Sequence, residues 1–126
     1  MEASRILLDN HKCKEGSFIY HLHELSEFSE EAYWEYYNAI VETTKITKNN
    51  DNMSRKTLDL VCNTYDFIIR SLMYHYMPDD LYTVSKLPLE VQPYIERLEY
   101  AFHGFLNGQI YDESIFELQN PTLSQS

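Results

Sequence analysis

The chain has 126 residues, a formal net charge of -10 from 20 acidic and 10 basic side chains, and a hydrophobic content of 44%. This length fits one domain, and the hydrophobic content is that of a folded chain rather than a disordered one. Nucleic acids and anionic membranes are disfavoured as partners, because both are bound largely through Lys and Arg, whereas a basic partner protein is favoured. With only 3 Gly and 4 Pro, the chain is expected to form a few long elements rather than many turns.

The chain carries no sequence signal for a membrane or for export. No apolar run approaches the roughly 20 residues that span a bilayer. The first ten residues lack the basic start, apolar run and cleavage site of a signal peptide. We therefore expect a cytoplasmic protein in which Cys13 and Cys62 are reduced thiols.

The first two segments are short. Residues Ala3 to Lys12 could be helical or extended, and Gly16 ends this segment. Ser17 to Leu25 has apolar residues at helical spacing, although an alternation of period two is also arguable. A helix is nevertheless the first choice for Ser17 to Leu25.

The next segment, Ser29 to about Lys45, is predicted as a helix, because Ser29 can cap it and two glutamates follow in its first turn. At about 100° per residue, Tyr33, Tyr37, Ile40 and Thr44 share one stripe. The opposite stripe and its two borders hold the residues that we predict to bind a partner: Glu31, Glu35, Asn38 and Glu42, with Trp34 and Tyr36. Aromatic anchors beside charge are typical of interfaces. The alternative is an acidic face that only meets solvent.

The second half contains the clearest helix, Ser54 to Met77, which Pro78 ends. Asp79 and Asp80 can open a short turn. Further predicted elements are a helix that starts near Pro88 or Pro93 and ends at Asn107-Gly108, and a short helix from Glu113 to Leu118. Asn120 to Ser126, and positions 121–126 above all, are expected to be frayed. The chain is thus predicted as a single all-α domain of residues 1–126, an irregular bundle of four to six helices.

Catalytic and metal sites have little support. His21 and His23 are two positions apart, so on a helix their imidazoles point about 200° apart and cannot share a metal. No nucleophile motif and no glycine-rich phosphate loop is present. We therefore predict no catalytic residue, no metal and no cofactor, and a protein that is not an enzyme.

One enzymatic alternative is a helical ribonuclease of the HEPN type, which uses an Arg followed four to six residues later by His. Three places fit this spacing: Arg70 with His75, Arg97 with His103, and Arg5 with His11. A chance match of such a loose pattern is expected, and the acidic charge opposes RNA binding. A structural or adaptor bundle, including a homodimer, is a further alternative.

The stretch from Gly16 to about Tyr37 resembles the small acidic immunity proteins of bacterial polymorphic-toxin and contact-dependent growth inhibition systems. The resemblance depends on Gly16-Ser17-Phe18, on Leu22-His23-Glu24 and on the block from Glu30-Glu31 to Trp34. It implies a specific inhibitor that binds a cognate toxin domain, often a nuclease, and blocks its active site or a nearby surface. Such a toxin would be a basic protein.

Overall fold

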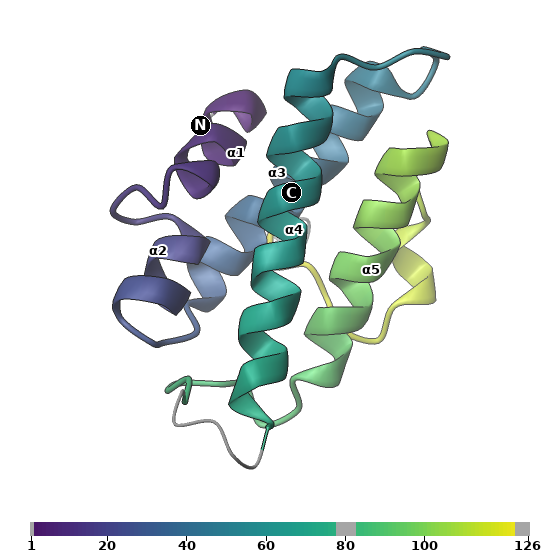
Figure 1. The fold of residues 1–126 in the computed structure, drawn as a ribbon. Helices are drawn as coiled ribbons and strands as arrows, with labels where there is room; N and C mark the ends of the chain where they lie inside the picture. The colour runs from purple at the N-terminus through teal and green to yellow at the C-terminus, as the bar shows by residue number, and fades with distance from the viewer. Residues whose placement is uncertain (1, 78–82, 123–126) are drawn as a thin grey trace.

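The computed structural model describes residues 2–77 and 83–122, which form a single compact helical bundle (Figure 1). The predicted all-α class is therefore confirmed. The described helices, with one short 3₁₀ turn, are α1 (Ala3–His11), α2 (Phe18–Glu24), α3 (Glu30–Thr47), α4 (Arg55–His75), α5 (Gln92–Asn107) and the turn η1 (Glu113–Ile115). The predicted turn at Asp79 and Asp80 lies outside the described residues.

Three of the helices begin at a serine cap. The hydroxyls of Ser17, Ser29 and Ser54 each accept a hydrogen bond from the backbone N–H three residues further on, at 3.1–3.2 Å. Each bond satisfies one of the N–H groups that the first turn of a helix leaves without a partner. The starts predicted near Ser29 and Ser54 are therefore confirmed, and Ser17 to Leu25 is resolved in favour of a helix.

The C-terminal elements differ from the prediction in two places. Helix α5 begins at Gln92 with Pro93 in its first turn, so Pro88 starts no helix. The predicted helix from Glu113 to Leu118 is only the turn η1, because Phe116 adopts an extended backbone conformation. The carbonyl oxygen of Leu118 accepts hydrogen bonds from a side chain of α5 instead of continuing a helix.

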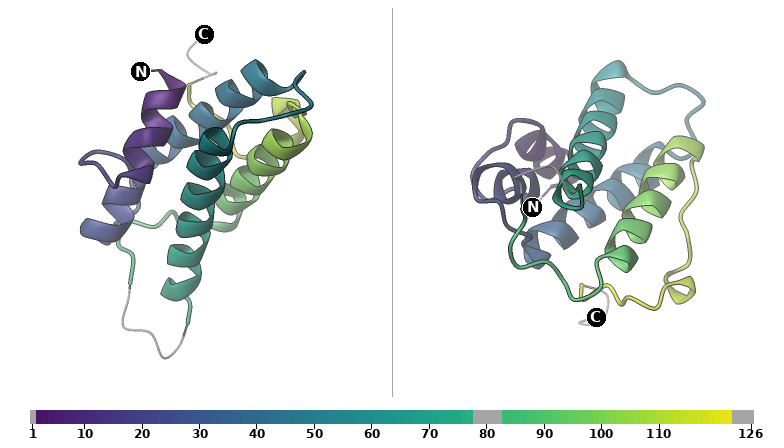
Figure 2. Two further views of the ribbon diagram at one scale, coloured as in Figure 1. Left: turned by 45° about the horizontal axis from the view of Figure 1, so that its top comes forward. Right: turned by 60° about the horizontal axis from the view of Figure 1, so that its bottom comes forward.

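Helix α3 is the centre of the bundle. It packs against α1 on one side and α5 on the other, while α4 crosses it and packs on α1, α2 and α5 (Figures 1 and 2). The hydroxyl of Tyr36 bridges from α3 to Thr64 of α4 at 2.7 Å. The described chain after α5 returns alongside that helix, and its Asn120 and Thr122 reach Asn38 of α3 (Figure 1). Helix α3 therefore has neighbours on nearly every side.

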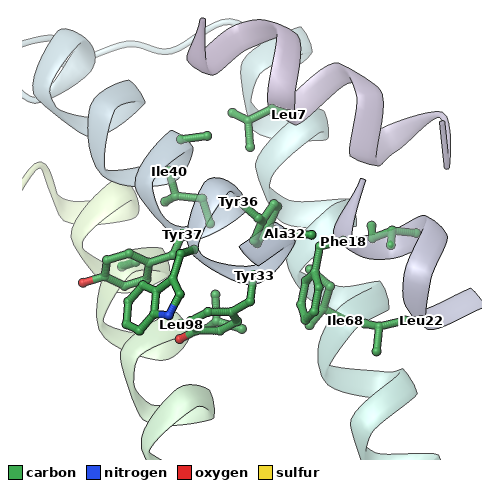
Figure 3. Packing of buried hydrophobic residues seen from close by; sticks show 14 of the residues in the cluster. Leu7, Phe18, Leu22, Ala32, Tyr33, Tyr36, Tyr37, Ile40, Ile68 and Leu98 are labelled. Carbon is green, nitrogen blue, oxygen red and sulfur yellow. The ribbon is translucent and has the colours of Figure 1, made fainter. Parts of the chain in front are cut away.

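The core around α3 is built largely from aromatic rings (Figure 3). Phe18 meets Phe28 and Tyr33 edge-on, with ring centroids 5.2 and 5.7 Å apart. The buried hydroxyl of Tyr33 donates to the carbonyl oxygen of Tyr94 at 2.7 Å. Burial raises the pKa of Tyr33 and of Tyr36 far above the usual tyrosine value, so both remain neutral donors. Several of the 11 tyrosines in the chain are therefore part of the interior.

Glu27 fastens the loop before α3 to the segment before α5. Its carboxylate lies 2.9 Å from Nδ1 of His21 and 2.9 Å from Nζ of Lys86. The backbones of the two segments are also joined, because Phe28 N–H donates to the carbonyl oxygen of Ser85 at 2.8 Å. The hydrogen bond to Lys86, followed by that to His21, holds the pKa of Glu27 below its usual 4.5.

This lowered pKa predicts a contribution to the pH dependence of stability. A carboxyl whose pKa is lower in the folded state stabilises the fold above its unfolded-state pKa, and this stabilisation is lost as pH falls through the folded-state pKa. The free energy of unfolding in urea should therefore be measured for wild type and for Glu27→Gln as the pH is lowered from above 4.5. It should fall less steeply with decreasing pH in the variant than in wild type. Glu24→Gln, which removes an exposed carboxylate 3.8 Å from His23, should leave the wild-type slope. Equal slopes for wild type and Glu27→Gln would contradict the assignment.

Candidate functional site

The predicted acidic face of α3 is present at its N-terminal half. Glu31 and Glu35 are exposed, and neither carboxylate forms an ion pair within the described part of the chain. Both project from a helix whose other faces are held by buried side chains. Their positions are therefore fixed by the fold, which leaves two unneutralised charges one helical turn apart on the surface.

The C-terminal half of the predicted face is engaged within the molecule. Asn38 is half-buried, because its side chain accepts a hydrogen bond from Asn120 at 2.8 Å and donates one to Thr122 at 3.1 Å. Glu42 is exposed but lies 2.9 Å from Nζ of Lys45. Asn120 and Thr122 are thus hydrogen-bonded to α3, positions 123–126 lie outside the described residues, and fraying of the C-terminal end stays a prediction. Asn38 is thus a contact for the C-terminal segment rather than a free surface residue.

The two predicted aromatic anchors are not on the surface. Trp34 is only 6% exposed and Tyr36 is fully buried. Tyr36 points between α3 and α4, and Trp34 packs edge-on against Tyr33 and Tyr37, with centroids 4.9 and 5.4 Å away. Both residues lie at the borders of the acidic stripe, but the helices and the C-terminal segment around α3 cover these borders. The prediction that Trp34 and Tyr36 anchor a partner is therefore wrong for this conformation.

Trp34 is covered by Arg97 of α5, whose guanidinium carbon lies 5.3 Å from the centre of the Trp34 ring and which belongs to a buried network between α5 and the C-terminal segment. Arg97 is 1% exposed. Its Nη1 donates to Oε2 of Glu113 at 2.7 Å and to the Tyr37 hydroxyl at 2.9 Å, and its Nε donates to the carbonyl oxygen of Leu118 at 2.9 Å. Its guanidinium carbon lies 4.2 Å from the centre of the Phe116 ring. Burial raises the pKa of Tyr37, and the Arg97 charge opposes part of that rise.

This network was missed in the sequence, where Arg97 appeared only as half of a ribonuclease-type spacing. A buried charge needs partners within hydrogen-bond reach. Those of Arg97 are 16, 21 and 60 positions away along the chain. The available signal was that Arg97 shares one side of its helix with Ala101 and Gly104, at i+4 and i+7. In the fold, Arg97 fixes the segment that borders the acidic face.

In the described structure, the arginine and the histidine of each Arg–His spacing contact different groups. Arg70 pairs with Asp66 at 3.3 Å, whereas His75 accepts the backbone N–H of Val84 at 2.8 Å. His11 pairs with Asp59 at 3.0 Å, and Arg97 is enclosed as described above. The HEPN-type hypothesis therefore has no geometric support among these pairs. The prediction that the protein is not an enzyme stays a prediction.

The histidines of α2 also have separate partners. His21 faces Glu27, and His23 lies edge-on to Phe67 with ring centroids 5.7 Å apart. Within residues 2–77 and 83–122, no three His, Cys, Asp or Glu side chains are grouped so that they could hold a metal ion. Cys13 and Cys62 are both free and half-buried, and burial raises the pKa of each thiol.

Comparison with known proteins adds no assignment: no protein-family model, no curated protein and no solved structure matches the chain. The helices of the described segments include none with both the length and the apolar character needed to cross a membrane. The acidic face, the apolar side chains that remain exposed and the cavities of the bundle are thus the features from which function is inferred.

Proposed function

We propose that this protein binds a cationic protein and, following the resemblance in its N-terminal half, that the partner is a bacterial toxin domain which it neutralises. The observation that carries the proposal is the pair Glu31 and Glu35. They are exposed, and they have no cation partner among the described residues. A surface of unneutralised acid attracts a basic protein and speeds the encounter.

The position of these two carboxylates suits an inhibitor. A nuclease keeps cationic groups in its active site for a phosphate substrate, and carboxylates held at fixed positions can occupy the same groups. Helix α3 provides such positions, because the aromatic side chains on its other faces pack into the core and set its orientation. The mechanism proposed is therefore occlusion of a basic surface, with no reaction on the part of this chain.

The test is a charge reversal of the pair. The partner would be captured from the native cell and identified, and its dissociation constant measured by calorimetry at low and moderate salt. Glu31→Lys with Glu35→Lys should weaken binding at least about tenfold and flatten its salt dependence. Asp51→Lys with Glu99→Lys makes the same change in net charge at other exposed positions and should have a much smaller effect.

Two results would count against the proposal separately. If the two double variants weaken binding of the partner equally, only the overall charge of the protein matters. The partner then does not bind specifically at the acidic face of α3. A captured partner whose expression does not inhibit growth, with or without this protein, would remove the toxin while leaving the binding face in place.

A further inference from the structure

A second surface lies at the end of the bundle where α5 begins. A groove of about 840 Å³ is bounded by the end of α4, the start of α5 and the segment after η1. We call it the α5 groove; the side chains that matter here are Tyr76, Leu89, Ile115, Glu90, Glu96 and Glu117. Nothing in the proposed function so far uses it.

The apolar side chains of the α5 groove are unusually exposed. Leu89 is fully exposed, at 104% relative accessibility, and Tyr76 and Ile115 are 59% and 53% exposed. Single exposed apolar residues are ordinary on protein surfaces, but several that line one depression are typical of an interaction site. The groove therefore offers the exposed apolar anchors that Trp34 and Tyr36, being buried, cannot provide.

The charges of the groove all have one sign at its surface. Glu90, Glu96 and Glu117 are exposed, and none of them forms an ion pair within the described residues. Arg97 is the one basic residue among those that line the groove, and its charge is buried and bonded to Glu113. A segment bound in the groove would therefore contact apolar side chains, with carboxylates around the edge of the groove and no accessible cation.

We propose that the α5 groove receives a segment of the partner protein in which apolar side chains are flanked by lysine or arginine. The apolar residues would pack on Leu89, Tyr76 and Ile115, and the basic residues would meet the rim. The inference rests on the proposed function, because it assigns a second contact to the same cationic partner.

The start of the helix that borders the groove is bonded directly to the start of the helix that carries the acidic face. The start of α5, which forms one wall of the groove, is bonded to the start of α3 through Tyr94. Its carbonyl oxygen accepts from Tyr33, and its hydroxyl donates to Glu30 at 3.2 Å. Glu30 immediately precedes Glu31 of the acidic face, so this bond links the start of α5 to the start of the acidic face.

The test uses synthetic peptides as probes, because they do not require the partner to be known. A peptide of leucine and lysine with leucines at helical spacing should bind, measured by fluorescence anisotropy of a label on the peptide. A Leu/Glu peptide with the same spacing should not bind, and a scrambled Leu/Lys peptide without an apolar face should bind more weakly. Tight binding of the Leu/Glu peptide would overturn the proposal.

Variants then locate the binding site. Leu89→Ser with Ile115→Ser should weaken binding of the Leu/Lys peptide about tenfold. Ile46→Ser with Leu106→Ser, which removes two exposed apolar side chains outside the groove, should change it by less than about twofold. Glu96→Gln with Glu117→Gln should weaken binding and reduce its salt dependence, whereas Glu99→Gln with Glu24→Gln should not. Equal effects of the groove and control variants would overturn the proposal.

Two further results separate this inference from the proposed function. If sedimentation velocity gives a dimer that Leu89→Ser with Ile115→Ser converts to a monomer, a second copy of the chain occupies the groove and the inference is wrong. If reversal of Glu31 and Glu35 abolishes binding of the captured partner while the groove variants leave it unchanged, the proposed function stands and the groove contact is excluded.

Discussion

Arg97→Met is expected to lower the free energy of unfolding by about 3–4 kcal/mol, in the lower part of the usual cost of breaking a buried ion pair, because Arg97 is buried but the Glu113 side chain is 36% exposed. The methionine fills similar space but lacks the N–H groups with which Arg97 donates hydrogen bonds to Glu113, Tyr37 and Leu118. The Glu113 oxygen Oε1 is already buried without a hydrogen-bond partner in the described structure, so loss of Arg97 leaves its carboxylate with little compensation. Urea unfolding measures the loss. Hydrogen exchange of the amides from Glu113 to Leu118 should become faster.

Two controls isolate the buried pair. Arg70→Met removes an arginine of the same size from an exposed pair with Asp66 and should cost less than about 1 kcal/mol. Adding Glu113→Gln to Arg97→Met should recover part of the loss, because it removes the charge left without a partner. A cost of less than 1 kcal/mol for Arg97→Met, or no recovery in the double variant, would show that the network contributes little to stability.

Gly108→Ala is expected to have the second largest effect, a loss of about 3 kcal/mol from two causes. Gly108 ends α5 in the left-handed conformation, with a φ of 73°, where a side chain costs about 1–2 kcal/mol. In addition, a Cβ there would lie 2.7 Å from the carbonyl oxygen of Lys48, so the turns that follow α3 and α5 would have to separate. Thermal or urea unfolding gives the measurement.

Gly16→Ala is the matched control for this prediction. Gly16 also has a left-handed backbone, with a φ of 93°, but a Cβ there would have no atom within 4 Å. Gly16→Ala should therefore lower the free energy of unfolding by about 1–2 kcal/mol, the cost of the left-handed backbone without a steric clash. If the two alanine variants are equally stable, the contact between Gly108 and Lys48 is not a constraint on the bundle.

Helix identity and helix ends could largely be predicted from the sequence. The serine caps at Ser29 and Ser54, the apolar period of α4 and the cap at Gly108 are local features, and each is set by residues within a turn or two. The exposed acids Glu31 and Glu35 could also be predicted, because they lie opposite the most apolar stripe of α3. Whether they bind a partner stays a prediction.

The remainder of the candidate site could not be predicted in this way. Periodicity identifies the residues that share one side of a helix, but not how many sides are covered by other elements. For α3, α4 meets Tyr36, the C-terminal segment covers Asn38, and Arg97 and Tyr94 of α5 cover Trp34. The exposed groove at Leu89 was missed for the same reason, since its walls come from three separate parts of the chain.

The sequence by itself thus determined an acidic, all-helical chain with the starts of α3 and α4, the α5 cap and the two free carboxylates of α3. Only the tertiary structure decided which border residues become core, which arginine is buried, and where apolar side chains stay exposed. The physical reason is how far apart along the chain the contacting residues lie. A helix and its caps depend on contacts over a few residues, whereas burial of Trp34, Tyr36 and Arg97 depends on groups up to 63 positions away.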